Sequence, residues 1–338
     1  MTQQAPLRDL SWAHGTLTVQ RLGGMLAPVT FVLKNGLQVS PMHIAPWADE
    51  PDTAELPGIL RRLRGEWPCI PFGYTAPVTG APAAWAPLQK ASEPGEHVHG
   101  FSSNHEWTWE PASDGSLALG LDYPVTSPVR RVERTVTPDP NGPAVDLMFR
   151  IHVRDACRLP LGLHPVFMLP AAPHTARLEP GRFDHGRTYP GVVEPSAPFF
   201  AIDQRFSDLS SVPLQNGGSV DASRLPFAED VEDLLQLNGI DGSCALTNPS
   251  GGYRVRLAWQ REHFPSLLLW FSNRGRKMPP WNGRHLAIGI EPVCSPFGLG
   301  PATATADNPV ARSGTPTARQ FNAGETFTTR YRISTEPL

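Results

Sequence analysis

The sequence has few charges and no long apolar run, and each shortage argues against a class of partner. Charged residues make up 18% of the 338 residues, the net charge is −3, and like charges do not gather into runs. Nucleic acids and anionic membrane surfaces are bound through basic patches, so neither is expected as a partner. No apolar run approaches the roughly 18 residues of a membrane span. The first residues, MTQQAPLRDLSWAHG, lack the basic start and apolar core of a signal peptide, so we expect a soluble cytoplasmic protein.

Cysteine is also scarce. The four cysteines lie far apart and form no C-x-x-C pair: Cys69, Cys157, Cys244 and Cys294. This spacing predicts neither a zinc site nor a disulfide framework, and it favours free, buried thiols.

Proline and glycine, in contrast, are abundant. The chain has 38 prolines and 30 glycines, which recur every few residues and do not gather into one linker. Both residues interrupt helices, and proline is kept out of central strands. Their distribution is typical of short connections between many short strands. Helical patterns are few: Glu55–Leu63 could form two turns, and Ala228–Leu237 a short helix capped near Asp230.

Strand patterns, by comparison, occur along the whole chain. In Tyr253–Trp259 apolar residues alternate with polar ones, as in a half-buried strand, whereas Ser266–Phe271 is apolar throughout and suits a strand covered on both faces. The segment from Ala171 to Asn216 predicts long loops and irregular strands. The other predicted strands are Leu17–Leu22, Phe31–Leu33, Leu37–Pro41, Ser116–Tyr123, Val129–Thr137, Val145–Val153, His285–Glu291 and Glu325–Ser334. We therefore expect a single all-β domain over residues 1–338, built from stacked, largely antiparallel sheets.

One stretch, GEHVHGFSSNHEWTW at positions 95–109, concentrates histidines, glutamates and tryptophans. On a strand, His97 and His99 would face the same side, and His105 or Glu106 could complete a metal site. Cupin barrels use such an H-x-H, but there the glutamate follows within five residues. Here Glu106 comes seven residues after His99. We therefore expect no metal.

Within this stretch, His99 differs from the other two histidines. His97 and His105 flank the segment Gly100–Asn104 and are expected to be exposed polar residues around a turn. His99 directly precedes Gly-Phe, so both its backbone and its ring could approach a ligand. Aromatic side chains nearby suit the apolar face of a sugar ring.

Two further polar residues lie in apolar surroundings. His164 stands in Gly162–Leu169, where a satisfied core histidine is one interpretation and a functional residue the other. Glu291 ends an apolar strand, where a carboxylate must be paired, hydrogen-bonded or functional, because burying an uncompensated charge is costly. If both side chains reached one concave face, they would supply an acid and a base.

Taken in order, these segments resemble the aldose 1-epimerase (mutarotase) superfamily from about residue 15 to 335, and especially its hexose-6-phosphate epimerase-like branch. No single motif is specific, but their order is. Five segments carry the resemblance. Arg64–Gly73 is similar to that branch's R-G-G-x-P-x-x-x-P-x-F-G with one residue fewer, His99-Gly-Phe101 to H-G-F-A-R, His164–Phe167 to H-x-Y-F, Glu291 to the glutamate of I-E-P, and Asp241–Leu246 to the segment of the substrate-contacting aspartate.

The resemblance implies a β-supersandwich and an enzyme that interconverts the α and β anomers of an aldose without a metal or organic cofactor. It implies Glu291 as the base, His164 as the acid and His99 as the group that stabilises the ring oxygen or C1 region. It further implies Asp241 as a substrate contact. With Arg64 from the matched motif and the aromatic faces of Trp107 and Trp270, four substrate contacts are expected. A small-molecule sugar is then the expected partner, and the protein would be a monomer or homodimer.

Two departures from the pattern bear on the substrate. Ser103 stands where the branch has an arginine, and Glu66 replaces a glycine. Arginine forks match phosphate geometry, so both changes weigh against a 6-phosphate and leave a neutral sugar or another carbohydrate open. Two alternative functions also stay open. One is a non-catalytic sugar-binding protein that stacks its ligand on Trp107, Trp270 and Trp281; the other is a glycosidase or lyase that uses Asp241 with Glu291.

Overall fold

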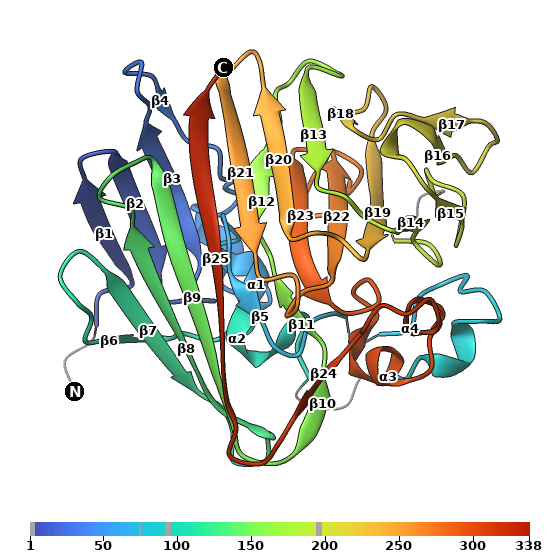
Figure 1. Ribbon diagram of the computed structural model, residues 1–338, viewed down its shortest axis with the longest axis horizontal. Helices are drawn as coiled ribbons and strands as arrows, with labels where there is room; N and C mark the ends of the chain where they lie inside the picture. Colours follow the sequence, from blue (N-terminus) through green and yellow to red (C-terminus); the bar gives the residue numbers. More distant parts are fainter. Residues whose placement is uncertain (1–3, 75, 92–95, 194–197) are drawn as a thin grey trace.

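The computed structural model describes residues 4–74, 76–91, 96–193 and 198–338, and its architecture is two large stacked β-sheets (Figure 1). The named strands pair with antiparallel neighbours in both sheets. This confirms the predicted all-β class of stacked, antiparallel sheets.

The first large sheet has nine strands. Their order across the sheet is β18 (Arg224–Leu225), β13 (Ala176–Pro180), β20 (Ser243–Asn248), β21 (Tyr253–Trp259), β25 (Thr326–Pro337), β9 (Ala144–Val153), β8 (Val129–Pro138), β7 (Leu117–Asp122) and β6 (Thr108–Glu110).

The second large sheet has eight strands, seven of them in one path. Their order is β15 (Arg205–Phe206), β14 (His185–Thr188), β19 (Val231–Asn238), β22 (Ser266–Asn273), β23 (Leu286–Cys294), β11 (Leu161–Leu163) and β5 (Pro68–Cys69), while β12 (Val166–Met168) pairs with β23.

Smaller sheets and short helices complete the fold. The first four strands form a sheet of their own: β1 (Leu7–Trp12), β2 (Gly15–Gln20), β3 (Leu26–Val32) and β4 (Gln38–Val39). Two pairs stand apart, β10 (Cys157–Leu159) with β24 (Arg319–Phe321) and β16 (Val212–Pro213) with β17 (Ser219–Val220). The α-helices are α1 (Gly58–Arg61), α2 (Gly100–Asn104), α3 (Gly300–Thr305) and α4 (Pro309–Arg312); the 3-10 turns are η1 (Pro51–Thr53), η2 (Ala86–Leu88) and η3 (Leu209–Ser211). In the described part of the chain, no helix is long and apolar enough to cross a membrane.

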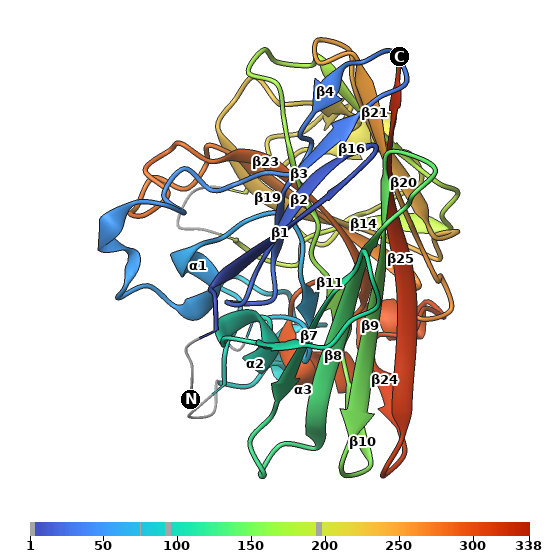
Figure 2. The same cartoon turned by 90° about the vertical axis from the view of Figure 1, so that its left-hand side faces the viewer.

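Both faces of the eight-stranded sheet are covered. Along β22, Leu267, Leu269 and Phe271 belong to the core shared with the nine-stranded sheet. The alternate residues, Leu268 and Trp270, belong to a second apolar cluster on the other face. This is why Ser266–Phe271 is apolar throughout, as the sequence predicts. Helix α1 contributes to the second cluster and lies on the side of the molecule away from β25 (Figure 2).

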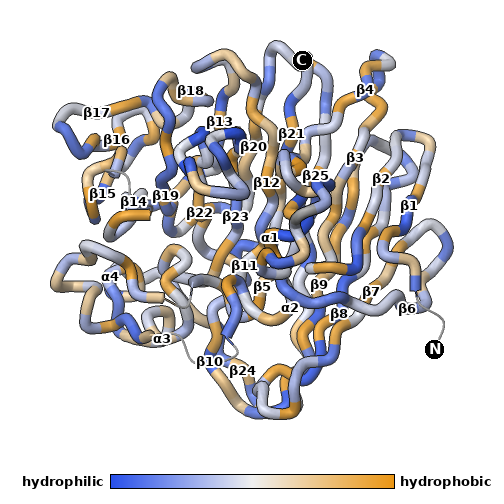
Figure 3. Tube along the Cα trace, turned by 180° about the vertical axis from the view of Figure 1, so that it is seen from behind, coloured by the Kyte–Doolittle hydropathy of each residue, from blue (hydrophilic) through white to orange (hydrophobic). Residues whose placement is uncertain are grey.

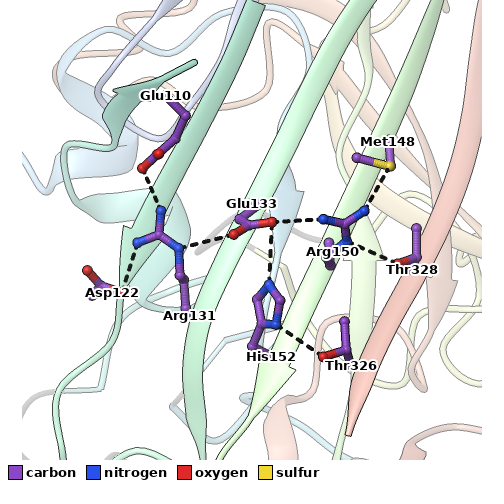
Figure 4. Close-up of polar contacts among 9 residues, drawn as sticks. All are labelled: Glu110, Asp122, Arg131, Glu133, Met148, Arg150, His152, Thr326 and Thr328. Carbon is purple, nitrogen blue, oxygen red and sulfur yellow. Dashed lines mark hydrogen bonds and ion pairs between the residues drawn. The ribbon is translucent and has the colours of Figure 1, made fainter. Parts of the chain in front are cut away.

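The nine-stranded sheet, in contrast, has one face turned outward. Along β8, buried residues such as Val132 alternate with partly exposed ones such as Glu133, and the tube in Figure 3 changes colour in the same rhythm. Ion pairs link the outward side chains across neighbouring strands, with Arg131 bonded to Glu110 and Glu133, and Glu133 to Arg150 and His152 (Figure 4). Ionic side chains along the sheet keep this face hydrated.

Most predicted strands are present with small shifts at their ends, but one predicted helix is wrong. In place of the helix predicted over Ala228–Leu237, the chain forms strand β19 (Val231–Asn238), which pairs with β22 over its whole length and is buried at every position. Glu232 and Asp233, which lie within the predicted helix, are both buried and hydrogen-bonded in this strand. The predicted helix Glu55–Leu63 is reduced to the single turn of α1.

Candidate active site

A cavity of about 320 Å³ lies on the second face of the eight-stranded sheet. Its polar wall contains His99, His164 and Glu291, which the sequence singled out together. Its other walls are largely apolar and aromatic, with side chains that include Trp67, Tyr74, Leu234, Leu268, Trp270 and Trp281. Of the four predicted substrate contacts, the described part of the structure brings Trp270 to the cavity.

Regular backbone pairing fixes Glu291 and His164. Glu291 lies in β23 opposite Leu268 of β22. The neighbouring Gly289 leaves room for the carboxylate, since a Cβ there would lie 2.5 Å from Glu291 Oε1. His164 lies between β11 and β12, and its backbone N–H donates to the carbonyl of Trp67 at 2.9 Å. Both side chains therefore project from rigid strands into the cavity.

His99 is placed by an unusual backbone turn. It has a left-handed conformation with φ of 57° and caps helix α2, and its N–H donates to Gly73. Gly100 follows with φ of 83°, and a Cβ on it would lie 2.1 Å from the carbonyl oxygen of Ile70. Only glycine fits this close approach. The turn sends the His99 ring towards Phe72, Tyr74 and His164.

His97 and His105 lie on a different side of this segment. Their rings are 5.0 Å apart, and His105 stacks on Phe101 at 3.6 Å. Both side chains are partly buried, whereas the sequence pattern predicted that they would be exposed. Because His99 begins a helix, the H-x-H rings do not share a strand face. Within the described ranges, no group of three His, Cys, Asp or Glu side chains could hold a metal ion.

The three polar residues of the cavity lie close together. His164 Nε2 is 3.5 Å from Glu291 Oε1, and the rings of His99 and His164 are 5.0 Å apart and nearly perpendicular. Trp67 stacks on His164 with ring centres 4.2 Å apart and planes 16° from parallel. The indole fixes the plane of the imidazole, so the histidine presents its edge to the carboxylate.

Burial favours the neutral forms of all three groups. It raises the pKa of Glu291 well above the usual range of a carboxyl group. Burial and the neighbouring His99 lower the pKa of His164 well below the usual value of a histidine. Burial and the charge of Arg276 lower the pKa of His99 to about 3. A carboxyl group with a raised pKa beside a histidine with a lowered pKa is the arrangement that general acid–base chemistry uses near neutral pH.

Several polar atoms of this wall have no hydrogen-bond partner among the described residues. They are His99 Nδ1, His164 Nδ1, Glu291 Oε2 and Trp67 Nε1. Leaving a buried polar atom unpaired costs about 1–3 kcal/mol, so a folded protein seldom has several in one place. Unpaired buried polar atoms gathered around one cavity are expected where a polar ligand binds.

Behind the aromatic wall, a buried carboxylate organises the other end of the cavity. Glu232 accepts hydrogen bonds from Trp270 Nε1 at 2.5 Å and Ser272 Oγ at 3.0 Å, and its Oε1 lies 3.3 Å from Arg276 Nε. The guanidinium of Arg276 lies over Trp281, 4.5 Å from the ring centre. Sequence reasoning missed Glu232 and Arg276, because Glu232 fell within the wrongly predicted helix and Arg276 lies in no recognised motif.

Three predicted substrate contacts are held elsewhere in the fold. Arg64 is buried against Asp49, with Nη2 2.8 Å from Oδ1. Asp241 precedes β20 and accepts hydrogen bonds from Arg182 N and Ser243 Oγ, both at 3.0 Å. Trp107 is fully buried in the core, and its Nε1 donates to the carbonyl of Ser102 at 2.9 Å. None of the three lies among the described residues that line the cavity.

Glu66 also points away from the cavity. Its carboxylate is fully buried, 2.6 Å from Arg134 Nη2 and 2.5 Å from Tyr331 Oη. The sequence suggested that this residue adds a negative charge to a phosphate site, but its partners come from β8 and β25 of the nine-stranded sheet. The next residue, Trp67, faces the opposite way and lines the cavity.

Comparisons with known proteins agree with this architecture. No family model and no curated protein sequence matches the chain. Among solved structures, a protein of Escherichia coli K12 provisionally described as an aldose 1-epimerase aligns over 98% of this chain and 99% of its own, with a TM-score of 0.65 and 13% identity. A galactose mutarotase-like protein from Lactobacillus casei aligns over 98% and 100%, with a TM-score of 0.62 and 14% identity.

A GalM/aldose epimerase homologue from C. elegans aligns over 98% of this chain and 99% of its own, with a TM-score of 0.62 and 13% identity. The chain therefore has the galactose mutarotase-like fold. At this identity the likeness extends to the fold alone, so what the cavity does has to be argued from its own residues.

Proposed function

We propose that the protein is a carbohydrate epimerase that interconverts the α and β anomers of an aldose. The observation that carries this proposal is the pair of His164 and Glu291, 3.5 Å apart in a cavity whose buried polar atoms lack partners among the described residues. The fold, which is shared with mutarotase-like proteins, supports the same reading.

The reaction needs one base and one acid. The Glu291 carboxylate takes the proton of the C1 hydroxyl, the C1 oxygen forms a double bond to C1, and the bond from C1 to the ring oxygen breaks. His164 in its protonated form gives its proton to the ring oxygen as that bond breaks. Rotation about the bond between C1 and C2 exposes the other face of the aldehyde. The reverse steps then close the ring to the opposite anomer.

Before and after ring opening, the two side chains hold one proton between them. In the empty cavity burial favours the form with both groups neutral, as the directions of their pKa shifts indicate. Moving the proton from Glu291 to His164 gives the reactive pair without exchange with solvent. Hydrogen bonds from sugar hydroxyls to Glu291 Oε2 would favour that transfer, because they stabilise the carboxylate form.

The aromatic walls suit the rest of a sugar. Trp67, Trp270 and Trp281 present ring surfaces to the cavity, and the C–H faces of a pyranose pack well on such surfaces. His99 lies beside His164, and its lowered pKa keeps it neutral. It can therefore donate or accept a hydrogen bond at the C1 region of the sugar without adding charge. The cavity thus supplies both an orienting surface and the two proton-transfer groups.

The direct test follows the optical rotation of freshly dissolved α-D-glucose and α-D-galactose with wild-type protein and with Glu291→Gln. We expect faster mutarotation with the wild type and a loss of about 10²–10⁴-fold in the variant, the usual contribution of a general acid or base. Glu336→Gln, on an exposed strand end paired with Arg256, is the matched control and is expected to keep the wild-type rate. Equal rates for Glu291→Gln and wild type would refute the role of Glu291.

A non-catalytic sugar-binding protein is the second candidate, and the aromatic wall of Trp270 and Trp281 favours it. It predicts sugar binding without any acceleration, with Glu291→Gln weakening binding only. A glycosidase that pairs Asp241 with Glu291 has no support in the geometry, because Asp241 is held by Arg182 and Ser243 outside the cavity lining.

A further inference from the structure

The cavity carries little net positive charge, and this limits the substrates it can hold. Among the described residues that line it, Arg276 is the sole lysine or arginine. The residues outside the described ranges, 1–3, 75, 92–95 and 194–197, contain no lysine or arginine either. Those segments therefore bring no lysine or arginine to the site.

The charge of Arg276 is already balanced within the protein. Its Nε lies 3.3 Å from Oε1 of Glu232, whose side chain is completely buried. The guanidinium also lies over the faces of Trp281 and Trp270, at 4.5 and 5.6 Å from the ring centres. Glu232 in turn is held by Trp270 Nε1 and Ser272 Oγ, so it cannot turn away when a ligand enters.

Three basic side chains that lie close in the chain to cavity-lining residues are held in ion pairs. Arg64, which could have served as a phosphate ligand, pairs with Asp49. Lys277 follows Arg276 in the chain but is exposed, and its Nζ lies 2.5 Å from Asp230. Arg284 pairs with Glu50 on the surface. A phosphate group that used one of these three cations would have to compete with its carboxylate.

We propose that the cavity selects uncharged aldoses over their phosphorylated or carboxylated forms, and that Glu232 sets this selectivity by balancing Arg276. The inference rests on the proposed function and names its substrate class. The phosphate of a sugar phosphate carries about two negative charges, which would lie beside Glu232 and beside the carboxylate that Glu291 forms during the reaction. Two like charges in a desolvated site repel strongly, whereas an uncharged sugar meets no such penalty.

The test compares three ligands with the same ring and different groups at C6: D-glucose, D-glucose 6-phosphate and D-glucuronate, with the corresponding galactose series in parallel. Affinity is read from tryptophan fluorescence, since Trp67, Trp270 and Trp281 line the cavity. Anomer exchange is measured on the same samples by exchange NMR. We expect the wild type to prefer the uncharged sugar by at least about tenfold.

Glu232→Gln removes the balancing charge and keeps hydrogen-bonding atoms for Trp270 and Ser272. We expect it to narrow or reverse the preference by at least about tenfold, through tighter binding of the 6-phosphate. Glu336→Gln makes the same change in net charge on the outer sheet and should leave the preference unchanged. If Glu232→Gln does not fold, the wild-type comparison decides alone.

The outcomes separate this inference from the proposed function. Anomer exchange that is accelerated equally for glucose and its 6-phosphate would overturn the inference and leave the epimerase intact. Preferential binding of uncharged sugar without accelerated exchange would support the inference and overturn the epimerase. A wild-type preference for the 6-phosphate, or the absence of binding by all of the sugars, would overturn the inference.

Discussion

The ion pair of Glu66 and Arg134 allows a quantitative prediction about stability. Both side chains are completely buried, with Glu66 Oε2 2.6 Å from Arg134 Nη2. Arg134 also donates to the backbone carbonyl of Gly24, and Tyr331 donates to Glu66 Oε1 at 2.5 Å. Burial alone would lower the pKa of Arg134, but the adjacent Glu66 raises it, so the arginine stays charged.

Replacing Arg134 with methionine would leave Glu66 buried and without its cation. Breaking a buried pair in this way costs about 3–5 kcal/mol, a large share of the ~5–15 kcal/mol by which a folded protein is stable. The hydroxyl of Tyr331 remains and offsets part of the loss. We therefore expect Arg134→Met to lower the free energy of unfolding by about 3–4 kcal/mol at pH 7.

The assay is urea unfolding, followed by tryptophan fluorescence and circular dichroism. The matched control is Arg256→Met, which breaks the half-exposed pair of Arg256 with Glu336 and should cost about 1 kcal/mol or less. The double variant Glu66→Leu, Arg134→Met removes both charges and should cost less than the sum of the two single changes.

One result of these measurements would contradict the reasoning. A loss of 1 kcal/mol or less at pH 7, equal to the surface control, would refute the claim that this pair is a buried, mutually dependent unit.

Three other predictions concern the site and its surroundings. First, His285 is buried, and burial, followed by the charges of His43 and Arg276, lowers its pKa well below the usual value of a histidine. The unfolded chain therefore binds a proton more readily than the folded chain, and wild-type stability should fall as the pH drops below about 6.5. The urea midpoint of His285→Phe should fall less steeply over this range, whereas that of the exposed control His174→Gln should fall as steeply as that of the wild type. Second, the rate of anomer exchange should follow a bell-shaped curve in pH, because a second proton on the His164–Glu291 pair removes the base and loss of the shared proton removes the acid. The lowered pKa of His164 and the raised pKa of Glu291 should widen the pH range of maximal rate. A fall in rate on the acid side that is centred at the usual pKa of histidine would contradict this. Third, Gly100→Ala would place a Cβ 2.1 Å from the Ile70 carbonyl and displace His99, so exchange should slow by at least about tenfold with substantial structure retained, and an unchanged rate would remove His99 from the site.

Local sequence patterns predicted most of the architecture. The alternation in Tyr253–Trp259 marks β21 at the observed ends, because one face of that strand meets the core and the other meets water. The apolar run Ser266–Phe271 correctly indicated a strand covered on both sides. His164 and Glu291 stood out because a polar residue in an apolar strand needs a reason, and the structure places both in one cavity.

Partners that are distant in sequence account for most of what could not be predicted. Glu232 was not singled out, because Trp270, Ser272 and Arg276, which hold it, lie well over thirty residues away in the chain. Glu66 resembled a change in a binding loop, yet it bonds Tyr331 across 265 residues. A single sequence shows that a charged side chain is present. Which way that side chain points depends on which strands the sheets bring together.

Asp241 and Arg64 show a second limit. Each was assigned by its spacing within a motif, and spacing holds only while the intervening loops keep their length and path. In the structure the carboxylate of Asp241 instead ties the connection before β20 to Arg182 and Ser243. Arg64 is likewise used to hold Asp49. Both residue types were chemically suitable, but both side chains are already hydrogen-bonded elsewhere in the fold.

The stability and the chemistry of the protein meet at two consecutive residues. In the extended segment that leads into β5, successive side chains point to opposite sides, so Glu66 faces the core and Trp67 faces the cavity. The pair with Arg134 fixes the segment from within, and the stacked indole then fixes the ring of His164. Losing Arg134 should therefore reduce the rate of anomer exchange even under conditions where the variant stays folded, because the imidazole ring of His164, the proposed acid, is then no longer held in a fixed plane. The surface pair of Arg256 and Glu336 has no such connection, so its loss should leave the rate unchanged.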